Sequence, residues 1–227
     1  MKKYLFLAII ALSLASCGVQ TAGVTKGMQY SQMYEEKPTS IVIMPPINKT
    51  NSVEAKEFFY TTLYLPLCEK GYYVYSPYLT MEMLQSESAY DSEMFIEGNI
   101  NSFQDVLGAD AAMFTVIKSW DKNSLSGVIT VGVEYILRST TTGTTLYERE
   151  GLIKLDTSIS STGGGLMGTL VNMAATAINT AMTDKVIAGR KCTALVLGDM
   201  PVGQYHENYS KDSGTPAGER IIKATIK

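Results

Sequence analysis

The strongest constraint on the fold is a run of alternating apolar and polar residues between positions 129 and 138. Every second residue of this run is apolar: Ile129, Val131, Val133, Tyr135 and Leu137. The residues between them are polar or small, apart from Ile136. Because successive side chains of a strand point to opposite faces, this period predicts a β-strand with one buried face. A register slip of one residue would expose the whole apolar set, so the pairing of this strand is well specified.

Two further strands are expected beside this one. Residues 111–117 form a largely apolar run before it, and residues 145–155 follow it after a turn over residues 140–144. Gly143 can supply the positive φ angle that such a turn requires. We therefore expect an antiparallel meander over residues 111–155.

The N-terminal half of the chain predicts a strand, helix, strand, helix unit. Residues 41–44 are apolar and are followed by two prolines, as expected for a buried strand that ends abruptly. Residues 52–67 have a helical period, with Ser52 placed to cap the helix and Pro66 placed to kink or end it. Residues 72–75 have the aromatic and branched composition of a second strand.

Three more helices are expected over residues 77–85, 102–107 and 166 to about 187. The predicted fold class is α/β, with one three-layer domain, a mixed sheet and a βαβα unit followed by the antiparallel meander and a long helix. We place this domain at residues 39–198. Residues 199–227 are rich in Gly, Pro and charged residues, so we expect an irregular C-terminal tail.

The N-terminal segment has the pattern of a lipoprotein signal peptide. Lys2 and Lys3 precede an apolar run over residues 4–14, which ends three residues before Cys17. Eleven residues of helix span only about 17 Å, whereas a bilayer core is roughly 30 Å thick, so this is not a spanning helix. We expect residues 1–16 to be removed and the thiol of Cys17 to carry the lipid. The alternative is an ordinary secretory signal in which Cys17 is incidental.

The sequence also predicts where the mature domain resides. Gly18 follows the expected lipid-bearing cysteine, which resembles lipoproteins sorted to the outer membrane, so we expect a lipid-anchored domain that faces the periplasm. Residues 17–38 lack a steady period and are expected to form its tether. Removal of the signal takes two lysines and no acid, so the formal net charge changes from −3 to −5. This charge argues against nucleic-acid binding, which depends on clustered Lys and Arg.

Several short motifs carry a resemblance to a known family. They lie at residues 43–46, 65–67, 69–74, 107–111, 143–147 and 203–206. Taken together they resemble the meningococcal-vaccine-candidate-like lipoproteins, a bacterial family of unassigned function, although Tyr147 stands where a Trp is expected and Gln204 where a Pro is expected. The resemblance implies a domain similar to the N-terminal domain of TolB and to curli-secretion lipoproteins. It also implies contacts with other envelope lipoproteins and a homodimer, and it brings no enzymatic activity.

Cys68 and Cys192 are the thiols left once Cys17 is acylated. Both would lie in an oxidising compartment, where they could form a disulfide. The alternative is that they are two small buried apolar side chains, as unpaired cysteines often are. The sequence leaves both alternatives open.

No motif supports catalysis, a cofactor or a metal site. His206 is the only histidine and has no clustered partner ligands, so we expect it to hydrogen bond within the tail. The glycines at residues 163–165 precede a helix but lack the Lys of a phosphate-binding loop, which indicates a hinge. Glu148 and Glu150 flank Arg149 on a strand and are expected to be solvated. An enzyme is therefore not expected.

Two apolar features could form either core or interfaces. The helix over residues 166–187 carries a broad stripe of Leu, Met and Ala that could be domain core or a self-association surface. Alternation places Tyr73 and Tyr75 on one face of their strand and Tyr72 on the other. Exposed tyrosines are favoured at protein interfaces, whereas buried ones pack in the core.

Together these features predict a non-enzymatic outer-membrane lipoprotein that acts as a structural or accessory subunit of an envelope assembly, with a role in secretion or transport. The alternative is a periplasmic module that binds a small molecule or peptide and delivers it to a transporter, which would require an apolar pocket.

Overall fold

The fold was analysed in a computed structural model that describes residues 23–123, 125–156 and 181–226. The strands are β1 (Ser40–Ile43), β2 (Ile47–Asn48), β3 (Tyr73–Val74), β4 (Ala111–Asn123), β5 (Val128–Ser139), β6 (Thr145–Asp156) and β7 (Ile221–Ile226). The helices are α2 (Lys26–Gln29), α3 (Ser31–Glu36), α4 (Val53–Thr62), α5 (Tyr64–Glu69), α6 (Pro77–Ser86), the 3-10 helix η1 (Ser92–Met94), α7 (Asn101–Leu107) and α9 (Ala181–Gly198).

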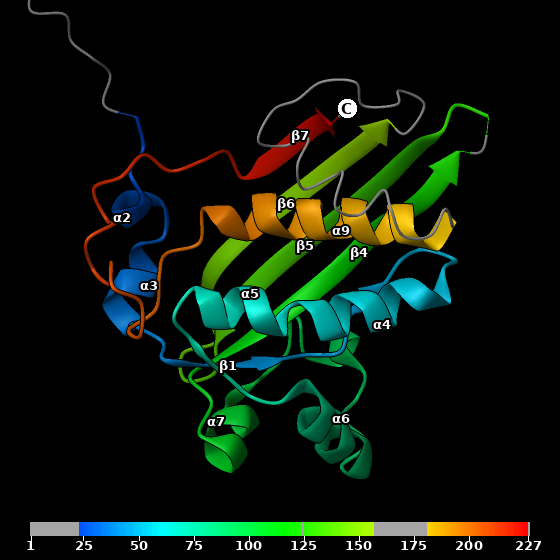
Figure 1. The fold of residues 1–227 in the computed structure, drawn as a ribbon. Coiled ribbons are helices and arrows are strands. Elements are labelled where there is room, and N and C mark those ends of the chain that lie inside the picture. Colours follow the sequence, from blue (N-terminus) through cyan, green and yellow to red (C-terminus); the bar gives the residue numbers. More distant parts are fainter. Residues whose placement is uncertain (1–22, 124, 157–180, 227) are drawn as a thin grey trace, which may run out of the picture.

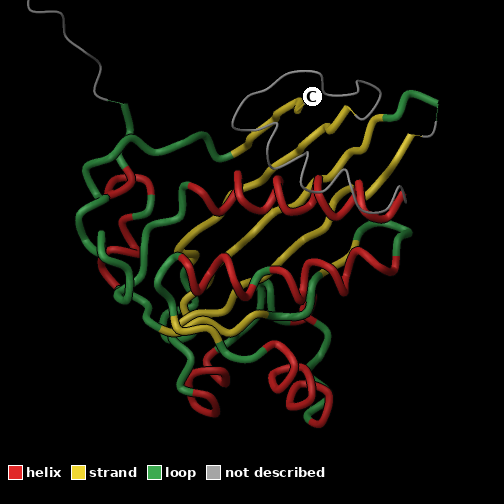
Figure 2. The backbone as a smooth tube through the Cα atoms, in the orientation of Figure 1, coloured by secondary structure: helices red, strands yellow, loops and turns green. Residues whose placement is uncertain are grey.

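Within the described residues the strands form one seven-stranded mixed sheet in the order β3-β1-β4-β5-β6-β7, with β2 also paired to β4 (Figure 2). The long strands β4, β5 and β6 are antiparallel neighbours, so the meander predicted over residues 111–155 is confirmed. Gly143 lies in the turn between β5 and β6 with a φ of 73°, so the predicted turn is confirmed. The flanking pairs β1 with β3, β1 with β4 and β6 with β7 are parallel.

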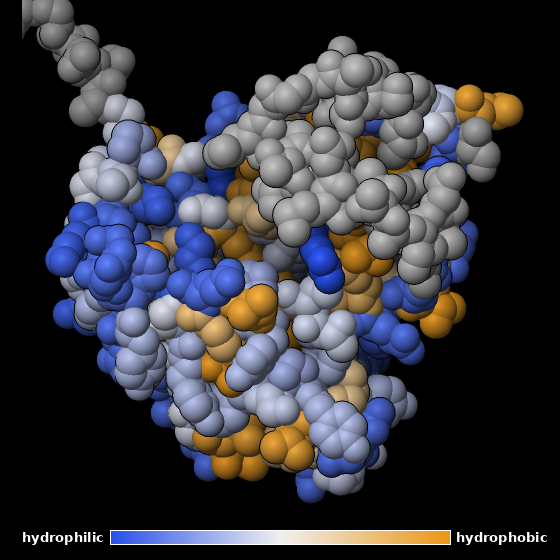
Figure 3. Space-filling view, viewed as in Figure 1, coloured by the Kyte–Doolittle hydropathy of each residue, from blue (hydrophilic) through white to orange (hydrophobic). Residues whose placement is uncertain are grey.

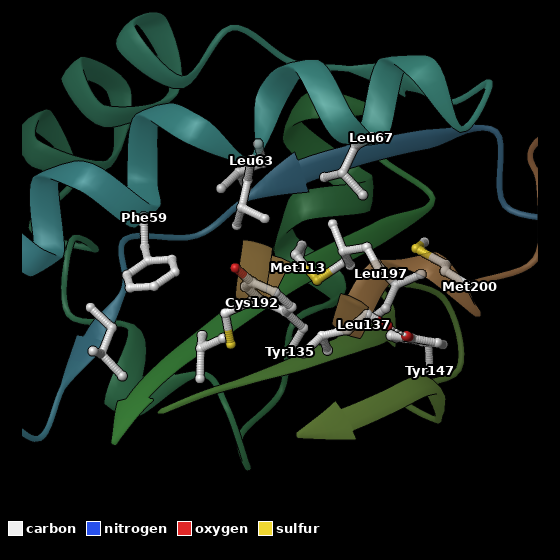
Figure 4. Close-up of a cluster of buried hydrophobic side chains, with 14 of the residues drawn as sticks. Phe59, Leu63, Leu67, Met113, Tyr135, Leu137, Tyr147, Cys192, Leu197 and Met200 are labelled. Carbon is white, nitrogen blue, oxygen red and sulfur yellow. Dashed lines mark hydrogen bonds between the residues drawn. The ribbon is translucent and has the colours of Figure 1, made fainter. Parts of the chain in front are cut away.

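Helices cover both faces of this sheet. In Figure 1, α4, α5 and α9 lie side by side across one face, whereas α6 and α7 lie on the other side of β1. The larger core fills the first interface, where Phe59 and Leu63 meet Tyr135 of β5 and Cys192 of α9 (Figure 4). The smaller core joins Leu84 and Phe103 to the opposite face of β1 and β4. The predicted three-layer α/β arrangement is therefore confirmed.

The N-terminal segment is more structured than the tether expected over residues 17–38. Within its described part, α3 packs against β6 of the sheet, α2 packs against α3, and Tyr30 and Met33 are each only 4% exposed. The hydroxyl of Tyr30 donates to Asp199 Oδ2 at 2.6 Å. These buried contacts place residues 24–38 in the domain, which corrects the expected boundary at residue 39. The partners of α2 and α3 lie far along the chain, so local periodicity did not predict them.

The expected irregular tail also contains regular structure. β7 extends the sheet beside β6, and Ile222 and Ala224 pack against the larger core. Residues 199–220 lack helices and strands, so the expectation of irregular structure fits them but not Ile221–Ile226. A strand of six residues has too short a pattern to be predicted without its partner strand. The composition of residues 199–227 therefore did not reveal β7.

The helices differ from the expected ones at their ends. The helix expected over residues 52–67 is divided into α4 and α5 at Leu63, one turn before Pro66. Proline lacks an N–H, and its ring clashes with the carbonyl four residues earlier, which here is that of Thr62, so the helix breaks at Leu63. Ser52 is the N-cap residue of α4 but makes no capping hydrogen bond with its side chain.

The long helix expected to end near residue 187 continues to Gly198 as α9. Its later turns bury Cys192, Val196 and Leu197 against the sheet, which explains the extension. The earlier part of that prediction, residues 166–180, and the glycines at 163–165 lie outside the described residues.

Candidate protein-binding groove

A groove of about 730 Å³ separates α5 from α9 and opens on the helical face of the sheet. It is lined by side chains of α4 and α5, of α9 and of the segment that follows α9: Thr61, Thr62, Leu65, Pro66, Glu69, Lys70, Arg190, Thr193, Ala194, Leu197, Gly198, Val202 and His206. Leu65 is 61% exposed, and an apolar patch is visible over α5 in Figure 3. The groove therefore combines apolar walls with charged residues.

The wall formed by α9 is fixed by side chains that bind its last carbonyl groups. The buried guanidinium of Arg149 donates through Nη1 to the carbonyls of Leu195 and Val196, at 3.0 and 3.1 Å. The hydroxyl of Tyr147 also donates to the carbonyl of Val196. The last carbonyls of a helix have no partners within the helix, so these donors satisfy groups that would otherwise be unpaired.

Lys70 joins the two walls. Its ammonium group donates to the carbonyls of Gly198 and Met200, at 3.0 and 3.2 Å. Burial lowers the pKa of Lys70, because removal from water disfavours the charged form. A cation near the C-terminal end of α9 is also favoured by the partial negative charge there. Lys70 therefore links α5 to the end of α9 across the groove.

Next to the groove, two glycines allow a close contact between two backbone segments. Gly71 has a φ of +83°, and a Cβ atom there would lie 2.5 Å from the backbone nitrogen of His206. A Cβ atom on Gly203 would lie 2.4 Å from the carbonyl oxygen of Gly71. The two segments are joined by backbone hydrogen bonds from Gly203 to Lys70 and from Tyr205 to Gly71. Two motifs that are far apart in the sequence, at residues 69–74 and 203–206, thus form one close contact.

The groove carries two cations without carboxylate partners. Within the described part of the chain, neither Lys70 nor Arg190 forms an ion pair. Arg190 is exposed on α9, and Glu69 is the acidic residue among the lining side chains. The groove therefore has an excess of positive charge on a chain whose formal net charge is −3. Neither Lys70 nor Arg190 was singled out from the sequence, because nothing local distinguishes them from solvated surface cations.

A tyrosine-rich surface adjoins α5. Tyr73 of β3 is 55% exposed and its ring lies 5.3 Å from that of Tyr75, whereas Tyr72 is only 5% exposed. The predicted alternation of these tyrosines is therefore confirmed. Tyr64 of α5 is 42% exposed, and the neighbouring thiol of Cys68 raises the pKa of its hydroxyl. Exposed tyrosines of this kind are enriched in protein interfaces.

Both cysteines considered for a disulfide are free thiols in the structure. Cys192 is fully buried, and its sulfur lies 3.6 Å from the carbonyl oxygen of Gly151 and 3.8 Å from that of Val131. Cys68 lies beside Tyr64 on α5. The alternative of a small buried side chain therefore describes Cys192, whereas Cys68 is half-buried. Cys17 lies outside the described residues.

The other candidate residues occupy separate places. His206 lines the groove, and its Nδ1 accepts a hydrogen bond from the backbone of Asn208 at 3.1 Å, as its expected hydrogen-bonding role requires. Glu150 accepts from Lys118 at 2.7 Å, and Glu148 pairs with Arg220. Within the described ranges, no three His, Cys, Asp or Glu side chains are grouped to hold a metal ion. In the same ranges, no helix has both the length and the apolarity needed to span a bilayer.

The sheet order and its helical covering define the class of the protein as a mixed α/β domain built on an antiparallel meander. The chain belongs to the family described as "Putative lipoprotein GNA1162-like", whose model matches residues 28–201. The match includes α3 and most of the groove, so the resemblance noted in the sequence is confirmed. It begins well before residue 39, in agreement with the position of α3 in the domain.

Individual relatives agree with this family. The chain is 26% identical over 186 residues to "Putative lipoprotein NMB1124/NMB1162" of Neisseria meningitidis serogroup B (strain ATCC BAA-335 / MC58), covering 81% of this chain and 84% of that protein. The crystal structure of lipoprotein GNA1162 from Neisseria meningitidis has a TM-score of 0.50 and 23% identity, covering 62% and 100% of the two chains. It shares the fold. A PelC dodecamer from Paraburkholderia phytofirmans has a TM-score of 0.39 and 14% identity, covering 71% and 86%.

Proposed function

We propose that this protein is a non-enzymatic accessory subunit of an envelope assembly, anchored to the outer membrane by lipid on Cys17 and facing the periplasm. Its role is to bind another protein through the groove between α5 and α9. Family membership supports the lipoprotein part of this proposal. The signal pattern over residues 1–16 and the small residue Gly18 after Cys17 support the anchor and the sorting.

The observation that carries the binding role is the composition of the groove. Leu65 and Pro66 offer apolar surface, and Lys70 and Arg190 offer positive charge, since neither forms an ion pair with a carboxylate of the described residues. A partner segment with apolar side chains and a carboxylate complements both properties. The exposed tyrosines beside α5 extend the same surface with residues that are typical of interface hot spots.

Photo-crosslinking from the groove tests this binding role. A photoreactive phenylalanine analogue at position 65 is expected to crosslink to one envelope protein in living cells. The matched control is position 106 on α7, where Val106 is 73% exposed on the opposite side of the sheet. Arg190→Glu is expected to remove the crosslink, whereas the charge reversal Lys223→Glu on β7 is expected to retain it. Equal crosslinking from both positions, or none from position 65 in a folded, lipidated protein, would contradict the proposal.

The anchor is tested separately. Intact mass and membrane flotation of the native protein are expected to show acyl chains and association with outer membranes. Cys17→Ala is expected to lose both. An unmodified, unanchored wild-type protein would overturn the anchor.

A second candidate function is carriage of a small molecule or peptide to a transporter. The volume of the groove favours it, because ligand pockets occupy about 300–1,000 Å³. Mass spectrometry of the protein purified from membranes distinguishes the two functions. A stoichiometric small molecule that is lost in Arg190→Glu would favour carriage, and a copurifying protein would favour the accessory role.

A further inference from the structure

The point at which the chain joins the domain limits how the domain can sit on a membrane. Val24 accepts a backbone hydrogen bond from Ala217 at 2.8 Å, and Lys26 and Gly27 donate to Thr215 and Ser213 at 2.9 and 2.8 Å. The chain is therefore part of the domain from Val24 onward. Cys17 precedes Val24 by seven residues, which can span at most about 25 Å.

This reach is short compared with the size of the domain. A domain of about 200 residues has a radius of gyration of roughly 17 Å, so its diameter exceeds 40 Å. A lipid on Cys17 would hold the surface around Val24 close to the bilayer, and other surfaces would be farther away. We name the surface formed by residues 24–29 and 213–217 the anchor face.

The anchor face is suited to contact with lipid. Val24 is 53% exposed and Met28 is 71% exposed, so both apolar side chains are available. Residues 24–29 and 213–217 contain no acid, although the mature chain has a formal net charge of −5 after the two lysines of the signal are removed. Their single charge, on Lys26, is 13% exposed and lies 4.0 Å from Asp212. A neutral surface with exposed apolar side chains meets anionic phospholipid headgroups without repulsion.

The opposite end of the domain is formed by the hairpin between β4 and β5. Glu36 of α3 accepts hydrogen bonds from Thr142 and Thr144, so α3 lies at the turn between β5 and β6. β5 has 12 residues and rises about 3.3 Å per residue, which places the other hairpin some 40 Å from that turn. Figure 1 shows this hairpin across the molecule from α2 and α3. Leu125 at its tip is fully exposed.

From this arrangement we infer that the anchor face lies against the phospholipid surface, with Met28 in the headgroup region, and that the hairpin carrying Leu125 points away from the bilayer. This orientation rests on the proposed lipid anchor. In this orientation the strands of the meander run away from the membrane. The hairpin is then the part of the domain that reaches farthest into the periplasm.

Quenching by brominated phospholipids tests the orientation. The full-length, lipidated protein is reconstituted into vesicles of phosphatidylethanolamine and phosphatidylglycerol, with or without brominated acyl chains. Met28→Trp adds a fluorophore on the anchor face, and Leu125→Trp adds one at the hairpin tip. The native Trp120 is 1% exposed and supplies the same background in both variants. Val24→Trp repeats the measurement at a second position of the anchor face.

Brominated lipid is expected to reduce the emission added by Trp at position 28 or 24 and to leave that added at position 125 unchanged. Quenching at position 125, or at neither end, would overturn the orientation while the mass of the protein still confirms its acyl chains. A chain that purifies without acyl groups would instead overturn the lipid anchor, and the orientation with it.

Discussion

Arg149 shows how one buried side chain fixes the geometry of the groove. It is only 7% exposed, and it donates to the carbonyls of Leu195 and Val196 on α9 and to that of Glu219 before β7. The sequence placed Arg149 on a strand between two acids that were expected to be solvated, and it assigned no role to Arg149 itself. Its burial depends on carbonyl groups more than 40 residues away, and no local pattern reveals them.

Arg149→Met is expected to lower the free energy of unfolding by about 3 kcal/mol, because it leaves buried carbonyls of α9 without donors. Arg220→Met is the matched control. The side chain of Arg220 is 61% exposed and pairs with Glu148, so its loss is expected to cost less than about 1 kcal/mol. Urea denaturation of both variants measures the difference. Similar midpoints for the two variants would show that the contacts of Arg149 do not stabilise α9.

Cys68 and Cys192 are expected to differ sharply in reactivity. Burial raises the pKa of the Cys192 thiol to about 12, whereas Cys68 is half-buried on α5. Because the thiolate is the reactive form, iodoacetamide at pH 8 is expected to modify Cys68 and to spare Cys192 until the protein unfolds. Peptide mass mapping measures both sites, and Cys192 should stay unmodified in the native Cys68→Ser variant as well. Two thiols that react only after reduction would instead reveal a disulfide between them.

At the scale of elements, strands with strong periodicity were predictable and short elements with distant partners were not. β5 has five buried apolar residues at alternate positions, so its existence and its buried face followed from local sequence. α3 and β7 have six residues each, and their burial comes from partners elsewhere in the chain. The break between α4 and α5 was predicted from Pro66, but its position depends on the turn before the proline.

The contact between α9 and β6 depends on Gly151. A Cβ atom there would lie 2.4 Å from Val196 Cγ2 and 3.1 Å from Cys192 Sγ. Gly151→Ala is therefore expected to force α9 away from the sheet and to lower the free energy of unfolding by about 1–3 kcal/mol. Gly198→Ala, at the end of the same helix, is the control because nothing lies within 4 Å of its Cβ position. Thermal unfolding measures both, and an unchanged midpoint for Gly151→Ala would contradict this packing.

At the scale of the molecule, the fold class was predictable and the groove was not. The groove brings α5 together with α9 and residues 202–206. The lining residues of α5 are more than 120 positions from those of α9. The fold brings Lys70 and Arg190 to the same groove, together with apolar side chains, and no local pattern shows this. The sequence pointed instead to Cys17 and to the tyrosines, because signal patterns and strand alternation are local properties.

The whole molecule is expected to lose stability at alkaline pH through its buried phenols. Tyr72, Tyr135 and Tyr147 are at most 5% exposed, and burial raises the pKa of each above the usual value of 10. Below pH 10 the folded and unfolded states both keep these protons, so stability does not change. Above pH 10 only the unfolded state releases them, and the free energy of unfolding therefore falls as the pH rises.

At pH 11 each such phenol is expected to lower the free energy of unfolding by about 1.4 kcal/mol, and the three together by about 4 kcal/mol. Urea denaturation between pH 8 and pH 11 measures this slope. Tyr135→Phe removes a hydrogen bond to Thr193 at every pH, so its diagnostic effect is a shallower dependence on pH rather than a lower stability. The same slope in Tyr135→Phe and in the wild type would contradict this prediction. It would mean that the phenol of Tyr135 ionises as readily in the folded state as in the unfolded one, because the core beneath α9 admits water.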